Sequence, residues 1–362
     1  MYIVIGILFF GILITIHELG HFTAAKLGGV RVFEFAIGMG PKLLKKQGKE
    51  TLYTWRLLPI GGFCNMGEDA ASEDPRAFVN QRAWKRTIIL AAGSIMNFLL
   101  GLLIILFLFS LPQAQQNGFP VPKITGLADG FPYEGEHGLQ VGDIFYKIDG
   151  ERIYTYNDVS LFLSRGGDSH TIVLLRDGQR VTLADFTMQK TIPGTDTDGK
   201  PVMLYGFTFE AREHGFGATL KFSWYQALSF VRMVRLGLSD LLTGRAGLND
   251  MAGLPGILNL FNDTGNQAQQ QDPNHSAGAG LQAVFYFGAF IAINLAVMNM
   301  LPIPALDGGR IVFLWITWVI EKITKRKLDP KYEGYIHGAV FVLLLGLIAY
   351  VTLHDVWRLI WG

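Results

Sequence analysis

Two histidines and a glutamate lie within the first long apolar stretch of the chain, in the pattern His-Glu-x-x-His. His17 and His21 are four residues apart, so on a helix both imidazoles project from one face and can reach a single Zn²⁺ ion. Glu18, beside the first histidine, is then placed to act as general base for the water molecule that such a metal activates. The residue types predict hydrolytic zinc chemistry on this helix.

A motif as short as this one can arise by chance, but its position in the sequence makes it more specific. Three ionisable side chains lie in a segment that is apolar enough to cross a membrane. A charged residue at the centre of a spanning helix costs about 2.5 to 3.5 kcal/mol on the insertion scale, so the placement requires a function or a partner. A cleaved signal peptide is not expected, because no lysine or arginine precedes Lys26.

The composition is typical of a membrane protein. Half of the 362 residues are hydrophobic (50%), and the net charge of +1, without a long basic run that includes aromatics, argues against a nucleic-acid partner. Cys64 is the single cysteine, which excludes an intrachain disulfide and a cysteine-based zinc site. Any metal must therefore be held by histidines and carboxylates.

Four apolar segments reach the length of about 20 residues that a bilayer requires. The first contains the His-Glu motif, and the others cover residues 87–111, 281–301 and 334–356. Residues 311–323 are also apolar but short, and we expect a partly buried or interfacial helix there. Basic residues gather in the first and third loops, which predicts that these loops are cytoplasmic and that both termini and the long middle section are extracytoplasmic.

The first loop has the composition of β-structure. Residues 30–35 and 52–58 favour strands, and glycines punctuate the loop at 38, 40, 61 and 62. We expect a β-hairpin that re-enters the membrane. Non-helical backbone at that depth is tolerated only where protein or water covers it, which suits the rim of a polar active site.

The middle section begins with short strand-like runs separated by Gly-Asp and Asp-Gly turns. The string Gly-Leu-Gln-Val-Gly-Asp at 138–143 resembles a PDZ domain, an α+β fold that receives an extended peptide beside a strand edge. The expected organisation is a membrane part at 1–111, the PDZ domain at 117–190, an amphipathic helix and linker at 191–280, and a second membrane part at 281–362. Within the third of these, we expect residues 220–242 to be helical and residues 262–280 to be a loop or linker.

Two histidines leave a tetrahedral zinc short of a protein ligand, and Asp307 is the best candidate for the third. It follows Asn299 in the segment Asn-Met-Leu-Pro-Ile-Pro-Ala-Leu-Asp-Gly-Gly, where two prolines interrupt the helix and glycines flank the carboxylate. The alternative is that Asp307 caps a helix starting near Arg310. We favour the ligand, because both polar clusters need a partner within the membrane.

With these motifs the sequence resembles the site-2 protease family of intramembrane zinc metalloproteases. Residues 35–41, 57–68 and 91–101 add to the resemblance, and the single PDZ-like insertion resembles the bacterial branch of the family. The resemblance implies that His17, His21 and Asp307 bind zinc, that Glu18 is the base, and that Asn299 holds substrate or polar groups of the reaction. Ser94 and Asn65 depart from the family pattern, away from the proposed zinc site.

The resemblance implies a function in regulated intramembrane proteolysis. The expected substrates are membrane segments of single-span proteins, such as anti-sigma factors or remnant signal peptides, and the expected location is the bacterial plasma membrane, with the PDZ domain outside the cytoplasm. Two other hypotheses are a non-enzymatic scaffold that presents a PDZ domain and a metal transporter. The scaffold predicts a broken zinc motif, and the transporter predicts ionisable residues in several spans.

Other polar residues are weaker candidates. Asn97, in the second span, either faces a cavity or forms a hydrogen bond to another helix. The remaining histidines are not expected to be ligands: His137, His170, His214 and His275 lie outside the spans, and His337 and His354 lie near the ends of the fourth span, where a membrane interface is expected.

Overall fold

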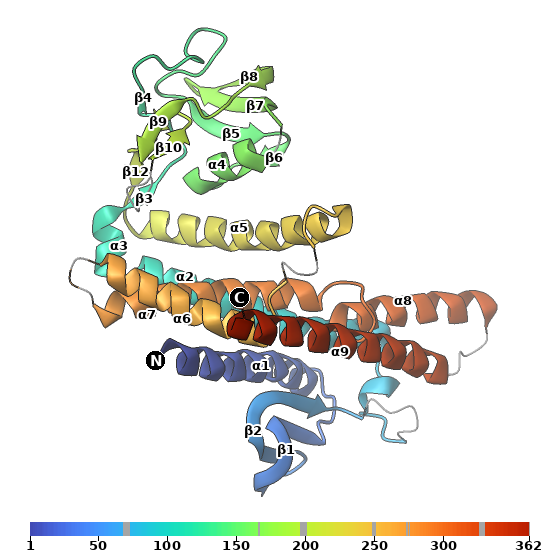
Figure 1. The fold of residues 1–362 in the computed structure, drawn as a ribbon. Coiled ribbons are helices and arrows are strands. Elements are labelled where there is room, and N and C mark those ends of the chain that lie inside the picture. Colours follow the sequence, from blue (N-terminus) through green and yellow to red (C-terminus); the bar gives the residue numbers. More distant parts are fainter. Residues whose placement is uncertain are drawn as a thin grey trace. The chain divides into compact units, whose positions relative to one another are not determined.

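The structure is a computed structural model that describes residues 1–67, 73–165, 167–195, 201–247, 251–272, 274, 276–325 and 330–361. Within these described residues, four helices are long and apolar enough to cross a membrane: α1 (Tyr2–Leu27), α2 (Ala83–Phe109), α7 (Ala277–Asn299) and the segment Gly334–Trp357 of α9 (Pro330–Trp361) (Figure 1). The chain is therefore a mostly helical, polytopic membrane protein. It divides into two compact units, residues 1–104 with 230–362, and residues 105–229.

One hydrophobic core of the first unit lies where α1 packs against α6 (Leu254–Gln271) and α7. Phe9 of α1 and Phe287 of α7 both pack against the ring of Phe261, with centroids 6.1 and 4.9 Å away. Gly6 lets α6 approach closely, since a methyl group there would lie 3.1 Å from the side chain of Leu258. This packing gives the motif-bearing helix α1 a rigid partner.

Helix α6 corrects one expectation. Residues 262–280 were expected to form a loop or linker, but α6 continues to Gln271 and α7 already begins at Ala277. The described polar residues of α6 after 261 are half-buried or exposed, and Phe261 and Gly265 are its buried residues. One of the polar residues, Gln269, accepts a hydrogen bond of 3.0 Å from the hydroxyl of Tyr2 in α1. Gly265 makes room for the ring of Tyr2. The contact between Gly265 and Tyr2 joins distant parts of the chain, so the local composition of residues 262–271 does not indicate it.

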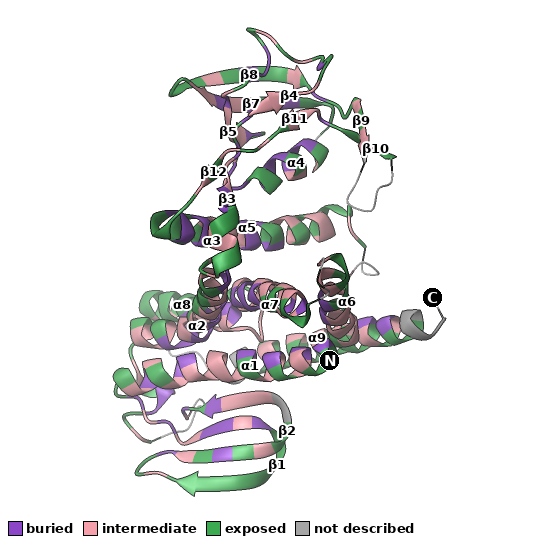
Figure 2. Ribbon diagram, turned by 90° about the vertical axis from the view of Figure 1, so that its left-hand side faces the viewer, coloured by how far each residue is buried: buried purple, intermediate pink, exposed green. Residues whose placement is uncertain are grey.

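The first loop folds into two long strands, β1 (Glu34–Gln47) and β2 (Leu52–Asn65). Both strands curve strongly beside α1 (Figure 2). The bend in β1 lies at Gly38 and Gly40, whose φ angles of 85° and 87° are readily adopted only by glycine. The hairpin contacts α1 through Phe35, which packs 5.1 Å from the ring of Phe22.

Because of the bend, the hairpin makes a small sheet with four segments. Residues 34–37 pair in parallel with 52–55 and in antiparallel fashion with 62–65, while residues 42–47 pair with the start of β2. The order across the sheet is therefore 62–65, 34–37, 52–55 and 42–47. Residues 62–65 form one edge of the sheet, and Gly62 in this edge lies next to Glu18 of α1.

A polar network on Glu34 holds the bent strands together. Its carboxylate accepts hydrogen bonds from Thr54 at 2.8 Å and Arg56 at 2.9 Å, and from Lys42 at 3.1 Å. Burial raises the pKa of the Glu34 carboxyl, but these hydrogen bonds lower it by more, so the net shift is downward. The network links the beginning of β1 to its second half and to β2.

The second unit is an α+β structure. Its main sheet has the order β6 (Glu151–Arg152), β5 (Ile144–Ile148), β7 (Ser169–Arg176) and β8 (Gln179–Thr187), and α4 (Tyr156–Arg165) lies between β6 and β7 in the chain. The short strands β3 (Phe119–Pro120) and β4 (Gly126–Leu127) pair with β12 (Arg212–Glu213) and β11 (Phe207–Thr208). Strand pairing in this unit thus continues beyond residue 190. The other elements are α3 (Pro112–Asn117), β9 (Ile192–Thr195), β10 (Pro201–Leu204) and α5 (Phe216–Thr243).

Candidate metal centre

Helix α1 places His17 and His21 on one face, one turn apart, toward α2. The two helices touch where Gly20 lies against the backbone of Ala92, a contact that no side chain at position 20 would allow. Gly93 of α2 lies directly against the two imidazoles: a methyl group on it would be 2.6 Å from Nε2 of His21 and 2.7 Å from Cε1 of His17. Two glycines therefore create the space in which the histidine rings meet.

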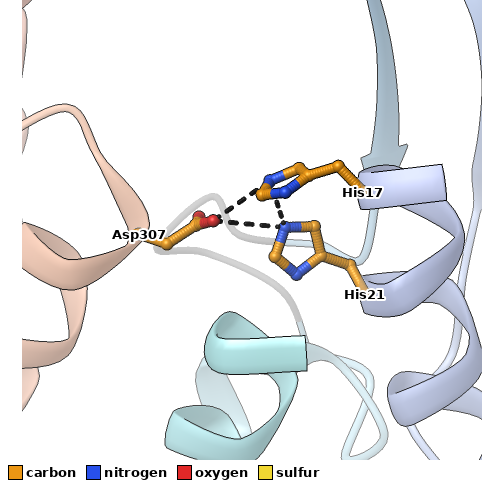
Figure 3. A group of neighbouring side chains, drawn as sticks. All are labelled: His17, His21 and Asp307. Carbon is orange, nitrogen blue, oxygen red and sulfur yellow. Dashed lines mark hydrogen bonds and ion pairs between the residues drawn. The ribbon is translucent and has the colours of Figure 1, made fainter. Parts of the chain in front are cut away.

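The third member of the cluster comes from the other end of the chain. Nε2 of His17 lies 3.1 Å from Oδ2 of Asp307, and Nε2 of His21 lies 3.4 Å from the same oxygen. The two Nε2 atoms are 3.1 Å apart. Figure 3 shows the two imidazoles and the carboxylate pointing toward one another from separate elements. Among the described residues, these three form the group of His, Cys, Asp and Glu side chains that could hold a metal.

The spacing of these atoms fits one tetrahedral metal ion. Two ligand atoms about 2.0–2.1 Å from a tetrahedral zinc lie about 3.3 Å from each other. The three separations of 3.1, 3.1 and 3.4 Å agree with that value. Two nitrogens and one carboxylate oxygen are also a donor set that zinc takes in hydrolytic enzymes, in which the fourth position stays open.

The tautomer of His21 is set by α2. Its Nδ1 lies 2.8 Å from the carbonyl oxygen of Ile89, so Nδ1 carries the proton and donates it, and Nε2 keeps its lone pair toward the cluster. His21 is only 6% exposed. Nδ1 of His17 is buried and has no hydrogen-bond partner in the described part of the chain. The two rings are thus oriented by different means, one by a hydrogen bond and one by packing.

Asp307 is the first residue of α8 (Asp307–Thr324). The alternative role for Asp307, a cap, required a helix that starts near Arg310. The carboxylate of Asp307 faces Nε2 of both histidines, and the residue preceding the helix is Leu306, without a side-chain cap. Gly308 and Gly309 lie against the backbone of residues 300–304, where any side chain would clash. Because Gly308 and Gly309 have no side chains, the start of α8 packs closely against the preceding turn, and Asp307 faces α1.

Glu18 lies beside the cluster without belonging to it. A methyl group on Gly62, in the edge segment 62–65 of the hairpin, would lie 3.4 Å from Cγ of Glu18. The glutamate therefore lies next to that edge, in a half-buried position on α1. Asn299 is the half-buried last residue of α7 and makes no hydrogen bond to the three clustered side chains. The structure brings Glu18 to the site and leaves the amide of Asn299 without such a contact.

Asn97 and the remaining histidines lie outside the cluster. Asn97 is 1% exposed and its Oδ1 has no partner among the described residues, so this oxygen does not make the helix-to-helix hydrogen bond considered above. His170 pairs with Asp149 at 2.8 Å, and His214 lies 3.2 Å from the carbonyl of Gln115. His275 lies outside the described residues. The sequence analysis does not identify Gly93 as part of the site. A glycine within an apolar span could have indicated a close contact between helices.

We expect Gly93→Ala to weaken zinc binding by about 10- to 100-fold, the range typical for disturbed orientation of metal-ligating side chains. The added methyl group would displace the imidazoles of His17 and His21. Zinc affinity of the purified variant, measured by competition with a chelator, tests this. Gly346→Ala in α9 is the matched control, because nothing lies within 4 Å of a methyl group there. Equal affinities in the two variants would contradict the tight fit.

Comparison with known proteins agrees with this geometry over most of the chain. Residues 5–347 match the model of peptidase family M50. A protein of Clostridium acetobutylicum that bears the name of a zinc metalloprotease is 36% identical, covering 98% of this chain and 97% of that protein. A protein of Clostridium perfringens with the same kind of name is 35% identical, covering 98% of each. The regulator of sigma-W protease RasP of Bacillus subtilis is 26% identical over 98% of this chain and 97% of its own length.

These matches confirm the expected family, the enzyme class and the dependence on zinc. Because the family pattern extends from residue 5 to residue 347 and full-length relatives share more than a third of their residues with it, the chain belongs to peptidase family M50, the site-2 proteases, and is a zinc-dependent metalloprotease.

Proposed function

We propose that this protein is an intramembrane endopeptidase in which His17, His21 and Asp307 hold the zinc and Glu18 is the general base. The observation that carries the proposal is the convergence of three ligand atoms at 3.1–3.4 Å, two of them within a candidate membrane span. A scaffold protein has no need for this arrangement. A catalytic metal that is bound by a membrane-spanning helix suits a substrate whose cleaved bond also lies within the membrane.

Zinc, when bound, supplies a Lewis acid that polarises the scissile carbonyl and eases deprotonation of water. The side chains supply the rest. The Glu18 carboxylate takes a proton from the attacking water and delivers it to the nitrogen of the leaving amine. The carbonyl of Ile89 keeps the proton of His21 on Nδ1, so that Nε2 stays available. The Nδ2 group of Asn299, at the end of α7, donates a hydrogen bond to the substrate backbone.

A helical substrate must unwind before it can be cut, because its peptide groups are hydrogen-bonded within the helix. We propose that the unwound segment pairs with the hairpin edge at 62–65. Support comes from two observations: within the described residues the backbone of this edge pairs with residues 33–37 on one side, and Gly62 lies beside Glu18. A peptide added to this edge recovers the backbone hydrogen bonds that unwinding removes, and it runs past the general base.

The hairpin is also proposed to enter the membrane. Large apolar side chains that the protein does not cover support this: Leu44 is 67% exposed and Trp55 56%, and Met39, Leu57 and Leu58 are also exposed. Residues 44 and 55 are directly paired across the sheet, so they form one apolar patch. Such a patch is stable in contact with lipid and unfavourable in water.

We propose that residues 117–190 form a PDZ domain outside the cytoplasm and that the protein resides in the bacterial plasma membrane. The α+β strand order of the second unit and the distribution of basic residues in the loops support this placement. The proposed substrates are single-span proteins such as anti-sigma factors or remnant signal peptides. The name of the Bacillus subtilis relative, a regulator of sigma-W protease, supports the first class.

The proposal is tested with a tagged single-span substrate and purified protein in detergent. We expect mass spectrometry to place the cut within the membrane segment, and a folded domain fused to the extracytoplasmic end to slow the cleavage. A version of the substrate with a polar, water-soluble segment in place of the span is the matched control and should resist. Cleavage of the control at an equal rate, or cuts confined to residues outside the span, would contradict an intramembrane protease.

A further inference from the structure

The turn that carries Asp307 has a strained backbone conformation and contains two prolines. Pro302 and Pro304 have no N–H group to donate, and Ala305 has a φ angle of 79°, in the left-handed region that favours glycine. Ala305 lies two residues before Asp307. A non-glycine residue persists in this region only when its surroundings determine it, and such residues concentrate at functional sites.

The surroundings that determine Ala305 include a side chain from α9. The N–H of Ala305 donates a hydrogen bond of 2.8 Å to Nδ1 of His337. The neighbouring N–H groups of Ile303 and Leu306 find carbonyls within the turn itself, at 2.7 and 3.1 Å. The ring of His337 also packs against Phe313 of α8, with centroids 5.1 Å apart. His337 thus contacts both the turn and the helix that Asp307 begins.

We propose that His337 is a positioning residue for the metal site: it fixes the left-handed turn at Ala305 and thereby directs the Asp307 carboxylate toward His17 and His21. The proposal rests on the assignment of Asp307 as a zinc ligand made above. His337 acts on the ligand through the backbone and touches neither the metal nor the substrate. It also makes the fourth candidate span part of the metal site, although the sequence predicts only a membrane interface at this histidine.

The chemistry of the contact suggests the variants. To accept from Ala305, His337 must carry its proton on Nε2 and keep the lone pair on Nδ1. Phenylalanine preserves the ring against Phe313 and removes the acceptor. Asparagine places its carbonyl oxygen close to the position of Nδ1 and preserves the acceptor. Glutamine carries the same amide one methylene group further out, where the oxygen no longer matches Nδ1.

The experiment measures zinc affinity of the full-length protein by competition with a chelator, together with the visible absorption of the cobalt-substituted protein. We expect His337→Phe to weaken zinc binding by about 10- to 100-fold, as is usual when an outer partner of a metal ligand is lost. The cobalt spectrum should change with it. His337→Asn should bind zinc like the wild type. His354→Phe, which replaces another α9 histidine that stacks on Tyr350, is the matched control and should leave both readouts unchanged.

The proposal is overturned if His337→Phe matches His354→Phe, or if the asparagine variant loses as much affinity as the phenylalanine variant. If the phenylalanine variant does not fold, His337→Asn and His337→Gln decide. Tighter zinc binding by the asparagine variant supports the acceptor role, and equal binding refutes it. Because the readout is metal binding, a wild type that holds zinc but cuts no substrate would refute the proposed substrate class and leave this test intact.

Discussion

Glu18→Gln is expected to reduce the turnover number by about 10²- to 10⁴-fold, the usual contribution of a general base. Glutamine keeps the shape of the side chain beside Gly62 but cannot take a proton from water. Because Glu18 is not one of the clustered ligand atoms, zinc content should be unchanged. The measurement is steady-state cleavage of a single-span substrate with zinc quantified in the same samples, and KM should change little.

Glu50→Gln is the matched control for this substitution. Glu50 is a partly exposed glutamate that pairs with Lys26 and Arg76, so the same chemical change occurs away from the cluster. This control should cut like the wild type. Retention of most activity by Glu18→Gln would place the general base elsewhere, and loss of zinc from that variant would show that Glu18 has a role in metal binding.

Asp307→Asn is expected to release zinc and abolish cleavage together. The substitution keeps the size of the side chain but removes the negative charge that faces both Nε2 atoms, at 3.1 and 3.4 Å. Loss of a direct ligand should weaken zinc binding by more than the roughly 10- to 100-fold seen when only an outer partner is lost. Chelator competition and metal analysis of the purified protein measure the effect.

Asp263→Asn provides the same change on α6, where Asp263 accepts a hydrogen bond from Asn259. That variant should retain zinc and activity. If Asp307→Asn kept its zinc while cleavage fell, Asp307 would act on the substrate and the third ligand would have to be another group. Full activity in Asp307→Asn would return this residue to the role of a helix-start aspartate.

The sequence alone was sufficient for the features that follow from helical periodicity and from the length and hydropathy of a segment. The spacing of His17 and His21 places them on one helix face whatever surrounds the helix, because the α-helical period is a property of the backbone. The four candidate spans follow from length and hydropathy, because each segment must by itself be long and apolar enough to cross the bilayer. The missing third ligand and the proline and glycine context of residues 299–309 indicated Asp307, without showing how it reaches α1.

Tertiary structure decided which groups from distant parts of the chain meet. The C-terminal part of α6 was not predicted, because its polar composition is typical of a linker. What identifies it as a packed helix is the contact of Phe261 and Gly265 with α1. The space for two imidazoles at Gly93, the carbonyl of Ile89 on His21 and the contact of His337 with Ala305 all depend on how separate helices pack. Sequence periodicity specifies the face of one helix, but the contact between two helices depends on interlocking side-chain shapes, which no single segment contains.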